Sequence, residues 1–485
     1  MGKIFKNQTE RTPSLIASLI PLAVLTVLLF LVIKAFGSDS ISGGSQIALL
    51  TATAICGVIS IFGFGCSWEK LEAAMTENIR ASGTAIVILL LIGAISGSWM
   101  LSGVVPTMIY YGLDLLNPKI FLVATCVICA LVSLLTGSSW TTVATIGVAF
   151  MGIGSALGFS EGWIAGAIIS GAYFGDKISV LSDTTVLASS TVGVPIFTHI
   201  QYMLYTSFPA FVVAMIVFTV VGFSGVQTDA ADVSAYTQTI SSTFNISPWL
   251  LAVPVLTGVL IAMRLPAIIT LFASTFMAAM VMLFVQPEIM SEVVGVTELD
   301  GMARFKAVFM SCYGSTSIQT PVEAVTDLIS TRGMSGMLST IWLIICAMCF
   351  GGAMAGSGML ETITRLFLRI VNGAASTVAS TLCSGFFFNL CTGDQYISII
   401  LTGRLFKSLY EKQGLEDRLL SRSVEDSATV TSVLIPWNTC GMTQATVLGV
   451  ATFTYLPYCI FNIASPIMSL LMALLGINIK RRLMK

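Results

Sequence analysis

Long apolar runs, separated by short polar clusters, make up most of this chain. Apolar residues fill 15–33, 47–64 and 84–105 near the N-terminus, and similar runs recur to the C-terminal end. A helix needs about 20 such residues to cross the hydrocarbon core of a bilayer. The pattern therefore predicts an all-α polytopic membrane protein.

Composition supports this class and narrows the possible functions. Of the 485 residues, 55% are hydrophobic and only 10% are charged, whereas soluble domains carry about 25% charged residues. The net charge of -1 gives no basic surface for nucleic acid, and the sequence lacks a Gly-Lys-Ser or Gly-Lys-Thr phosphate-binding motif. The eleven cysteines lack metal-ligand spacing and are typical of small buried side chains. We expect neither a cofactor nor a nucleic-acid partner.

A polar cluster over 171–193 lies between two apolar runs that are each too short to span alone. It contains two carboxylates, a lysine and paired threonines, namely Asp176, Lys177, Asp183, Thr184 and Thr185. Ionisable residues at membrane depth are costly and usually mark an ion pathway. We predict a broken helix over about 162–198 whose oxygens bind a small cation. A soluble loop between two spans is the alternative.

A second polar cluster, Thr136-Gly137-Ser138-Ser139-Trp140-Thr141-Thr142, separates two apolar runs whose outer ends are poor in Lys and Arg. This arrangement predicts a re-entrant helical hairpin over about 119–158, with its polar tip inside the bilayer and both ends outside. Two ordinary spans joined by a polar turn remain the alternative.

The second half of the chain repeats the first in the same order. Ala353–Leu360 echoes Ala94–Leu101, and Thr392-Gly393-Asp394-Gln395-Tyr396 echoes the polar tip at 136–140. Repeats of this kind are common in secondary transporters. We predict one repeat over 1–223, an external linker over 224–247 and a second repeat over 248–485. The second repeat should hold a hairpin at about 374–408 and a broken helix at about 424–455.

The basic residues predict that the two repeats are inverted. Arg365 and Arg369 precede the second hairpin and Arg404, Lys407 and Lys412 follow it. Positive charge favours the cytoplasmic side, so the second hairpin should open inward and the first outward. The count is then ten full spans and two hairpins, with both termini cytoplasmic. The region 287–332 should be external, although its three basic residues fit that side poorly.

Other polar residues of the second half leave alternatives open. Asp394 is flanked by apolar runs and is hard to place in water, which favours a functional role. Glu425 and Asp426 fit either helix-end charges at the cytoplasmic surface or a buried role. We expect His199, the only histidine, at the membrane interface.

Four motifs together resemble the signatures of the NhaC family of sodium/proton antiporters. They are the tip motif 136–142, Gly175-Asp176-Lys177 with Leu181-Ser182-Asp183-Thr184-Thr185, Leu390–Tyr396, and Leu434-Ile435-Pro436-Trp437-Asn438-Thr439-Cys440-Gly441. Valine stands at 180 and 433, where the family pattern has proline, and at 186, where it has asparagine. The resemblance implies a multi-pass secondary transporter of the bacterial inner membrane that exchanges sodium for protons. Some family members instead couple such exchange to malate, lactate or amino acids.

These observations predict two mirrored half-sites. The first comprises Asp183, Thr184 and Thr185 with Ser138 and Ser139; the second comprises Asp394, Gln395, Asn438 and Thr439; Asp176 and Asp426 are further candidates. The resemblance implies sodium as the bound cation, at Asp183, Thr184 and Asn438. Because Lys177 is beside it, Asp176 is expected to serve only as a partner charge or a helix-end group.

We expect proton and cation to compete at Asp183, since a carboxylate removed from water holds its proton more tightly. The other function classes fit the sequence less well. An ion channel would need continuous polar faces, and an intramembrane aspartyl enzyme would need Asp183 and Asp394 paired. A homodimer in the lipid bilayer is compatible with the sequence.

Overall fold

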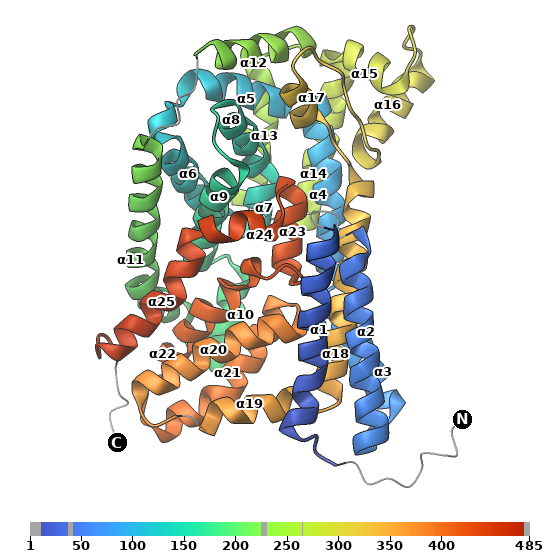
Figure 1. Cartoon of the computed structure of the whole chain (residues 1–485). Helices are drawn as coiled ribbons and strands as arrows, with labels where there is room; N and C mark the ends of the chain where they lie inside the picture. The colour runs from blue at the N-terminus through green and yellow to red at the C-terminus, as the bar shows by residue number, and fades with distance from the viewer. Residues whose placement is uncertain (1–10, 37–41, 225–229, 264, 370, 480–485) are drawn as a thin grey trace.

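A computed structural model describes residues 11–36, 42–224, 230–263, 265–369 and 371–479 (Figure 1). Its regular elements in these ranges are helices, apart from a single bridge between Thr316 and Thr331. Nine of the described helices are long and apolar enough to cross a membrane, or up to twelve spans if each of three bent helix pairs counts as one. The prediction of an all-α polytopic membrane protein is confirmed.

Two ends of the molecule can be distinguished in Figure 1. One carries α12 (Ala230–Thr243), α15 (Pro287–Val294), α16 (Gly301–Tyr313) and α17 (Glu323–Ile329). We call it the α12 end. The opposite end carries α19 (Met359–Arg369), and we call it the α19 end. The region 287–332 thus lies at the α12 end, away from the start of α1; Asp229 of the predicted linker lies outside the described residues.

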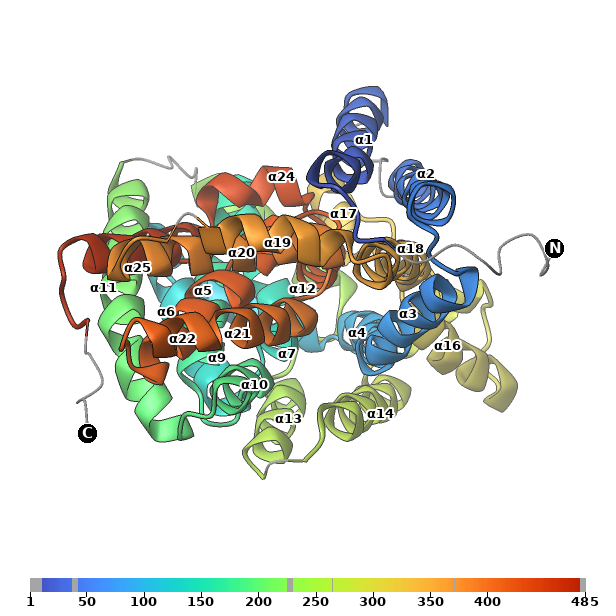
Figure 2. The same cartoon turned by 90° about the horizontal axis from the view of Figure 1, so that it is seen from below.

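A first group of scaffold helices gathers on one side of the molecule when it is viewed from below (Figure 2). It contains α1 (Leu15–Phe36), α2 (Gly44–Val58), α3 (Trp68–Ala81) and α18 (Leu338–Gly356). Ser67 begins α3 by accepting a hydrogen bond from the Lys70 amide, as an N-cap serine does. After Ser82 the chain continues as α4 (Gly83–Leu101).

Close glycine contacts show that α18 runs antiparallel to α3 and α4. A Cβ added to Gly352 would lie 2.5 Å from Met75 Cα, and one added to Gly93 would lie 2.6 Å from Gly333 O. The sequence echo makes α4 and α18 equivalent helices of the two repeats. Equivalent helices that run in opposite directions are what inverted repeats require.

In the structure, α4 and α18 match each other in a register that differs by one helical turn from their match in the sequence. α4 ends one residue before Ser102-Gly103, and α18 ends one residue before Ser357-Gly358. Both glycines adopt a left-handed conformation, with φ of 81° and 75°, which glycine adopts without steric cost. Matching Ala94–Leu101 to Ala353–Leu360 therefore misaligned this part of the repeat, because two glycine- and serine-rich runs lie close together.

Each scaffold group combines helices from both repeats. α2 packs along α18, where Gln46 Nε2 donates to Ser339 O at 3.3 Å. In the equivalent group, α14 (Ala267–Val285) packs along α4, where Trp99 Nε1 donates to Ser274 Oγ at 3.0 Å. Neither half of the chain therefore completes a scaffold group by itself.

Two helix pairs with polar tips face this scaffold. The first is α6 (Phe121–Thr136) followed by α7 (Ser139–Thr142), a π-helical turn at Val143–Gly147 and α8 (Val148–Ala156). The second is α20 (Ala374–Thr392) followed by α21 (Gln395–Lys412). Gly137 and Gly393 join them, with φ of 65° and 67°.

The two broken helices lie against these tips. α9 (Glu161–Ile178) and α10 (Asp183–Val192) are bent by 46° at a short break. The other consists of α22 (Asp417–Val424), a π-helical turn at Glu425–Thr429, a short turn and α23 (Thr439–Leu448). The remaining helices are α5 (Val104–Leu115), α11 (Ile196–Phe223), α13 (Ala252–Ala262), α24 (Thr452–Tyr455) and α25 (Ile460–Leu474).

Serine side chains form the first break without the proline of the family pattern. Ser179 Oγ donates to Leu134 O at 2.8 Å and accepts from the Leu181 amide at 3.2 Å. Ser182 then begins α10 by accepting from the Thr185 amide. These bonds satisfy backbone groups that the break releases.

Candidate functional site

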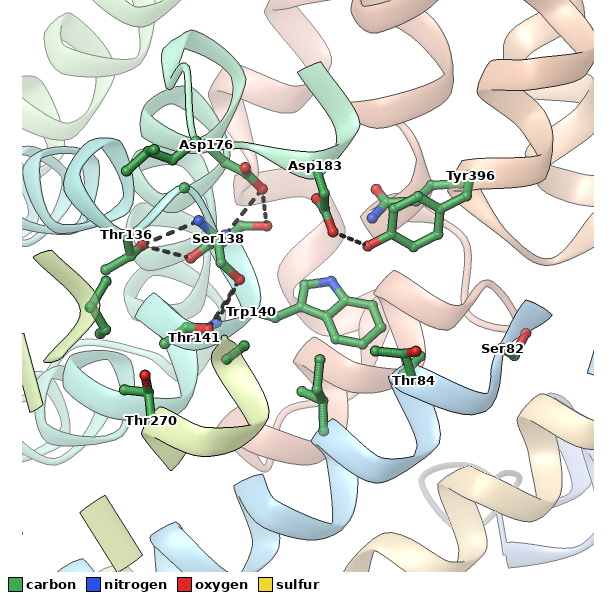
Figure 3. Close-up of a pocket in the computed structure, with 18 of the residues that line it drawn as sticks. Ser82, Thr84, Thr136, Ser138, Trp140, Thr141, Asp176, Asp183, Thr270 and Tyr396 are labelled. Atoms are coloured by element: carbon green, nitrogen blue, oxygen red, sulfur yellow. Dashed lines mark hydrogen bonds between the residues drawn. The ribbon is translucent and has the colours of Figure 1, made fainter. Parts of the chain in front are cut away.

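A cavity of about 520 Å³ lies between the hairpin tips and helices α4, α13 and α14 (Figure 3). Carboxylates from both repeats line it, namely Asp176, Asp183 and Asp394, together with several hydroxyl groups. Among the described residues of its wall, none is Lys, Arg or His. Such a wall attracts cations and repels anions. The α13–α14 turn and the α3–α4 junction also border it, and both point away from the α12 end.

Asp183 is the first residue of α10 and its side chain is open to the cavity. Its Oδ2 accepts a hydrogen bond from the Tyr396 hydroxyl at 2.7 Å, and its Oδ1 accepts from the Thr184 amide at 2.8 Å (Figure 3). Tyr396 comes from the second hairpin tip. The bond therefore joins the first broken helix to the opposite repeat.

Asp176, near the end of α9, binds the first hairpin tip. Its Oδ2 accepts from the Ser139 amide at 3.0 Å and from the Ser139 hydroxyl at 2.7 Å. Its Oδ1 has no hydrogen-bond partner among the described residues. One carboxylate oxygen thus holds the tip, and the other is buried.

Asp394 begins α21 and holds the second tip. Its Oδ1 accepts from the amides of Tyr396 and Ile397, at 2.9 and 3.1 Å. Its Oδ2 accepts from the Thr439 hydroxyl at 3.2 Å. Asp394 is therefore both a helix cap and a link between the second hairpin and the second broken helix.

The two tips share the same local bonds at equivalent positions. Thr136 Oγ1 donates to Ser138 O at 3.2 Å, and Thr392 Oγ1 donates to Asp394 O at 3.1 Å. The next contact is also repeated: Ser139 bonds to Asp176, and Gln395 accepts from Ser432 at 3.4 Å. The repeat thus extends from sequence motifs to individual hydrogen bonds.

Four residues of the predicted half-sites do not line the cavity, namely Thr184, Thr185, Asn438 and Thr439. Thr184 Oγ1 bonds to Ser182 Oγ at 3.0 Å, and Thr185 Oγ1 donates to Lys177 O at 3.0 Å across the helix break. Asn438 is buried, and its Oδ1 accepts from the Cys440 amide at 3.1 Å at the start of α23. The structure places Asp183 at the cavity wall but not the other two predicted sodium ligands, Thr184 and Asn438.

Asp426 lies instead in a second ionic cluster that is separate from the cavity wall. Lys177 Nζ forms an ion pair with Asp426 Oδ1 and donates to Ser465 Oγ at 2.9 Å. Asp426 Oδ1 also accepts from Ser465 at 3.0 Å and from Thr206 at 3.2 Å. Lys177 is therefore the partner of Asp426, and the expectation that it pairs with Asp176 was wrong.

At this cluster the structure decides one open alternative and contradicts one expectation. Glu425 and Asp426 are both completely buried, which decides against helix-end charges at the surface. His199 is also completely buried, with its Nδ1 2.8 Å from Ser421 Oγ, although we expected it at the interface. Neighbouring helices supply these contacts, so the local sequence could not show the burial.

Sequence reasoning also missed two aromatic residues of the cavity. The Tyr396 hydroxyl binds Asp183, and Trp140 projects into the cavity beside them (Figure 3). Trp140 Nε1 is buried without a hydrogen-bond partner among the described residues. Both belong to the tip motifs, so their position in a polar cluster was the available signal.

A smaller cavity of about 250 Å³ occupies the equivalent place in the other half. The end of α1 and the starts of α2 and α18 border it, as do Pro436 and Trp437. Trp437 Nε1 donates to Leu390 O at 2.8 Å. These helix ends point toward the α12 end, so the two cavities lie on opposite sides of the tips.

Comparison with known proteins gives consistent matches over most of the chain. Residues 171–477 match the model of the Na+/H+ antiporter family. A malate-2H(+)/Na(+)-lactate antiporter of Bacillus subtilis is 38% identical over 85% of both chains. The Na(+)/H(+) antiporter NhaC of Alkalihalophilus pseudofirmus is 36% identical over 87% of this chain and 89% of its own. An arginine/ornithine antiporter of Halobacterium salinarum is 32% identical over 96% of this chain and 93% of its own.

Proposed function

The chain belongs to the Na+/H+ antiporter family, and from this premise we propose that it exchanges sodium for protons across the bacterial inner membrane. The observation that carries the proposal is the open Asp183 carboxylate in a cavity walled by three aspartates. Oxygen atoms are the preferred ligands of hard cations, and the exposed Asp183 carboxylate offers them there. The hydroxyls of Ser138 and Ser139 line the same wall.

Competition at Asp183 would couple the two ions. Because a carboxylate in a cavity at membrane depth has less water around it than one in bulk solvent, we propose that Asp183 holds a proton in the absence of a cation. An arriving sodium ion would displace that proton, and the Tyr396 hydroxyl would keep the carboxylate in position by its bond to Oδ2. One carboxylate then carries either ion, but not both together, which gives antiport.

The two cavities support transport by alternating access. The α3–α4 junction and the end of α13 border the large cavity, whereas the end of α1 and the starts of α2 and α18 border the small one. We propose that the large cavity opens toward the α19 end and the small one toward the α12 end. The basic residues around the second hairpin favour a cytoplasmic α19 end, with both termini on that side. We therefore propose that the structure is open to the cytoplasm.

We also propose a transporter and not an intramembrane aspartyl enzyme. Asp183 is bonded to Tyr396, whereas Asp394 is engaged by two backbone amides and Thr439. Aspartyl catalysis requires two carboxyl groups that share one proton. The separate partners of Asp183 and Asp394 favour separate roles.

A second candidate function is exchange that also moves a small organic solute. The cavity volume of about 520 Å³ is far larger than a single sodium ion needs. Relatives named for malate and lactate and for arginine and ornithine set the solutes to test. The carboxylate wall favours the cationic amino acids over the carboxylates.

Purified protein in liposomes that contain a pH-sensitive dye tests both candidates. Sodium, lithium and potassium are added alone, followed by malate, lactate, arginine and ornithine. We expect a sodium-dependent change of internal pH without any organic solute. A response that requires an organic solute would favour the second candidate, and no response to any addition would contradict both.

A further inference from the structure

We propose that Glu425 is a second proton-binding site, placed behind the cavity and separate from Asp183; this inference rests on the proposed sodium/proton exchange. Glu425 begins the π-helical turn of the second broken helix, next to Asp426. Its side chain is completely buried. It does not line the large cavity.

The carboxyl group of Glu425 lacks the bonds that a buried carboxylate normally has. Neither Oε1 nor Oε2 has a hydrogen-bond partner among the described residues. The Thr429 hydroxyl, at the end of the same turn, is also buried without a hydrogen-bond partner among the described residues. An ionised carboxylate without such bonds is strongly disfavoured in a buried site, so burial favours the protonated form.

Nearby cations favour the ionised form of Glu425. Lys177 and Arg422 are both completely buried, and Asp426 lies between them, with its Oδ2 3.8 Å from Arg422 Nε. These three groups leave one uncompensated positive charge. Ionised Glu425 would neutralise it, whereas protonated Glu425 leaves it in place. The opposing effects of burial and of Lys177 and Arg422 allow the proton to be bound and released.

Charged groups near Glu425 come from its own turn and from neighbouring helices. Asp176 and Lys177 of α9 and Asp426 of its own turn interact with it electrostatically. Helices α10, α20, α21, α22 and α25 also pack against this turn. The sequences of α20 and α25 contain no Asp, Glu, Lys, Arg or His. The charged residues of the other three helices are Asp183 on α10, Arg404, Lys407, Glu411 and Lys412 on α21, and Asp417, Arg418 and Arg422 on α22. Among the described residues at this turn, Asp176 is the acid that connects Glu425 to the cavity.

Asp176 links Glu425 to the first hairpin tip and to the cavity. Its Oδ2 holds the first hairpin tip through Ser139, its buried Oδ1 has no hydrogen-bond partner among the described residues, and the residue lines the cavity. Asp176 would therefore relay the proton between Glu425 and the cavity. A sodium ion at the cavity wall adds positive charge near a cluster that is already positive. Coulomb repulsion then favours release of the Glu425 proton. Sodium binding and proton binding at Glu425 therefore oppose each other.

The predicted consequence is an additional proton per cycle. Competition at Asp183 accounts for one proton per sodium, and Glu425 supplies a second. The exchange should then move net charge and respond to membrane voltage. Without the Glu425 proton, exchange should become electrically neutral.

The test counts the protons released when sodium binds. Wild-type protein and Glu425→Gln are titrated with sodium in two buffers of different ionisation enthalpy, which gives the number of protons released per sodium bound. We expect Glu425→Gln to bind sodium and to release about one proton fewer. In liposomes, its exchange should lose the dependence on voltage. Glu361→Gln removes a surface carboxylate paired with Arg365 and should match the wild type.

Several outcomes would overturn this inference. Equal proton release and equal voltage dependence in wild type and Glu425→Gln would exclude Glu425 while leaving sodium/proton exchange intact. Wild-type protein that neither binds nor exchanges sodium would contradict the proposed function itself.

A measurement on wild-type protein covers the case in which Glu425→Gln fails to fold. A hydrophobic carbodiimide, which reacts with protonated buried carboxyl groups, should label Glu425 at low pH. Sodium should reduce that labelling about tenfold, a typical size for coupling between two sites. Labelling that does not respond to sodium would overturn the inference.

Discussion

The two hairpin tips have equivalent bonds, yet they face different surroundings. The cavity of about 520 Å³ is bordered by six residues of the first tip, Thr136 to Thr141, and by three of the second, Asp394, Gln395 and Tyr396. The second tip is packed against α18: a Cβ added to Gly393 would lie 3.1 Å from Ala347 Cβ, and one added to Gly351 would lie 2.7 Å from Thr392 O. Only about 250 Å³ remains open in that half. Two similar halves in unequal states are what alternating access about a central site requires.

The comparison also suggests what must change during transport. Trp437 Nε1 is bonded to Leu390 O beside the closed tip, whereas the equivalent residue of the first repeat, Leu181, lines the open cavity. Leucine has no such donor. The closed half therefore has a specific bond to break, and the open half can close by apolar packing.

The largest expected effect comes from the carboxylate of the open half. Asp183→Asn keeps the shape and one oxygen but can neither release a proton nor neutralise a cation. We expect sodium-driven proton exchange in liposomes to fall at least about 100-fold, ~2.7 kcal/mol, at every pH. Asp114→Asn, an exposed position on α5, is the matched control.

Asp176→Asn should retain partial activity, because the amide oxygen can still accept from Ser139. Full exchange by Asp183→Asn would move the coupling role to Asp394 or Asp426.

Substitutions at the two tip glycines should reduce exchange to different extents. Valine at Gly137 or Gly393 should abolish transport in inserted protein, since both adopt left-handed φ. Alanine should discriminate between them. At Gly137 the added Cβ would lie 2.6 Å from the Leu181 backbone carbon, a closer contact than any at Gly393. We expect about a tenfold loss of exchange for Gly137→Ala and a smaller loss for Gly393→Ala. Equal losses would contradict the difference between the tips.

Accessibility from each side tests which half is open. In a cysteine-free background, Thr84→Cys probes the large cavity and Thr446→Cys the small one. A membrane-impermeant maleimide should label Thr84→Cys at least about tenfold faster from the cytoplasm than from outside, because a water-filled access path lowers the barrier to the thiol. Thr446→Cys should react slowly from both sides. Fast labelling of Thr446→Cys from outside would show that the second half is also open.

The smallest effect is expected from the bond that closes the second half. Trp437→Phe keeps an aromatic ring but removes the hydrogen bond to Leu390, which contributes about 1 kcal/mol. That energy corresponds to roughly a fivefold shift toward opening of the closed half. The shift should appear as faster labelling of Thr446→Cys from outside. Phe453→Leu in the same cavity wall is the control and should leave the labelling rate unchanged.

The local sequence predicted the tips and helix breaks well for a physical reason. Polar residues next to glycine within apolar runs have few alternatives to a helix end inside the membrane, and Gly137 and Gly393 mark such ends. The sequence could not distinguish an oxygen that caps a helix from one that faces a cavity. Asn438 therefore resembled a ligand, although its Oδ1 accepts from Cys440 N.

The sequence could not predict which side chains far apart in the chain bond to each other. The bond from Tyr396 to Asp183 joins residues 213 positions apart, and the pair of Lys177 with Asp426 spans 249. Both depend on how the repeats pack together. The neighbour of Lys177 in the chain, Asp176, was therefore the wrong partner to expect.

The mixed scaffold groups have a consequence for synthesis. Gln46 of α2 bonds to the carbonyl of Ser339, which lies 293 residues further along the chain. Ribosomes add about 5–20 residues per second, so this partner arrives roughly 15–60 s later. Throughout that interval α2 is in the membrane without α18, the helix that it packs along in the finished protein. An interrupted or slowed translation should therefore leave α2 as a target for membrane proteases, and the first half expressed alone should be degraded quickly.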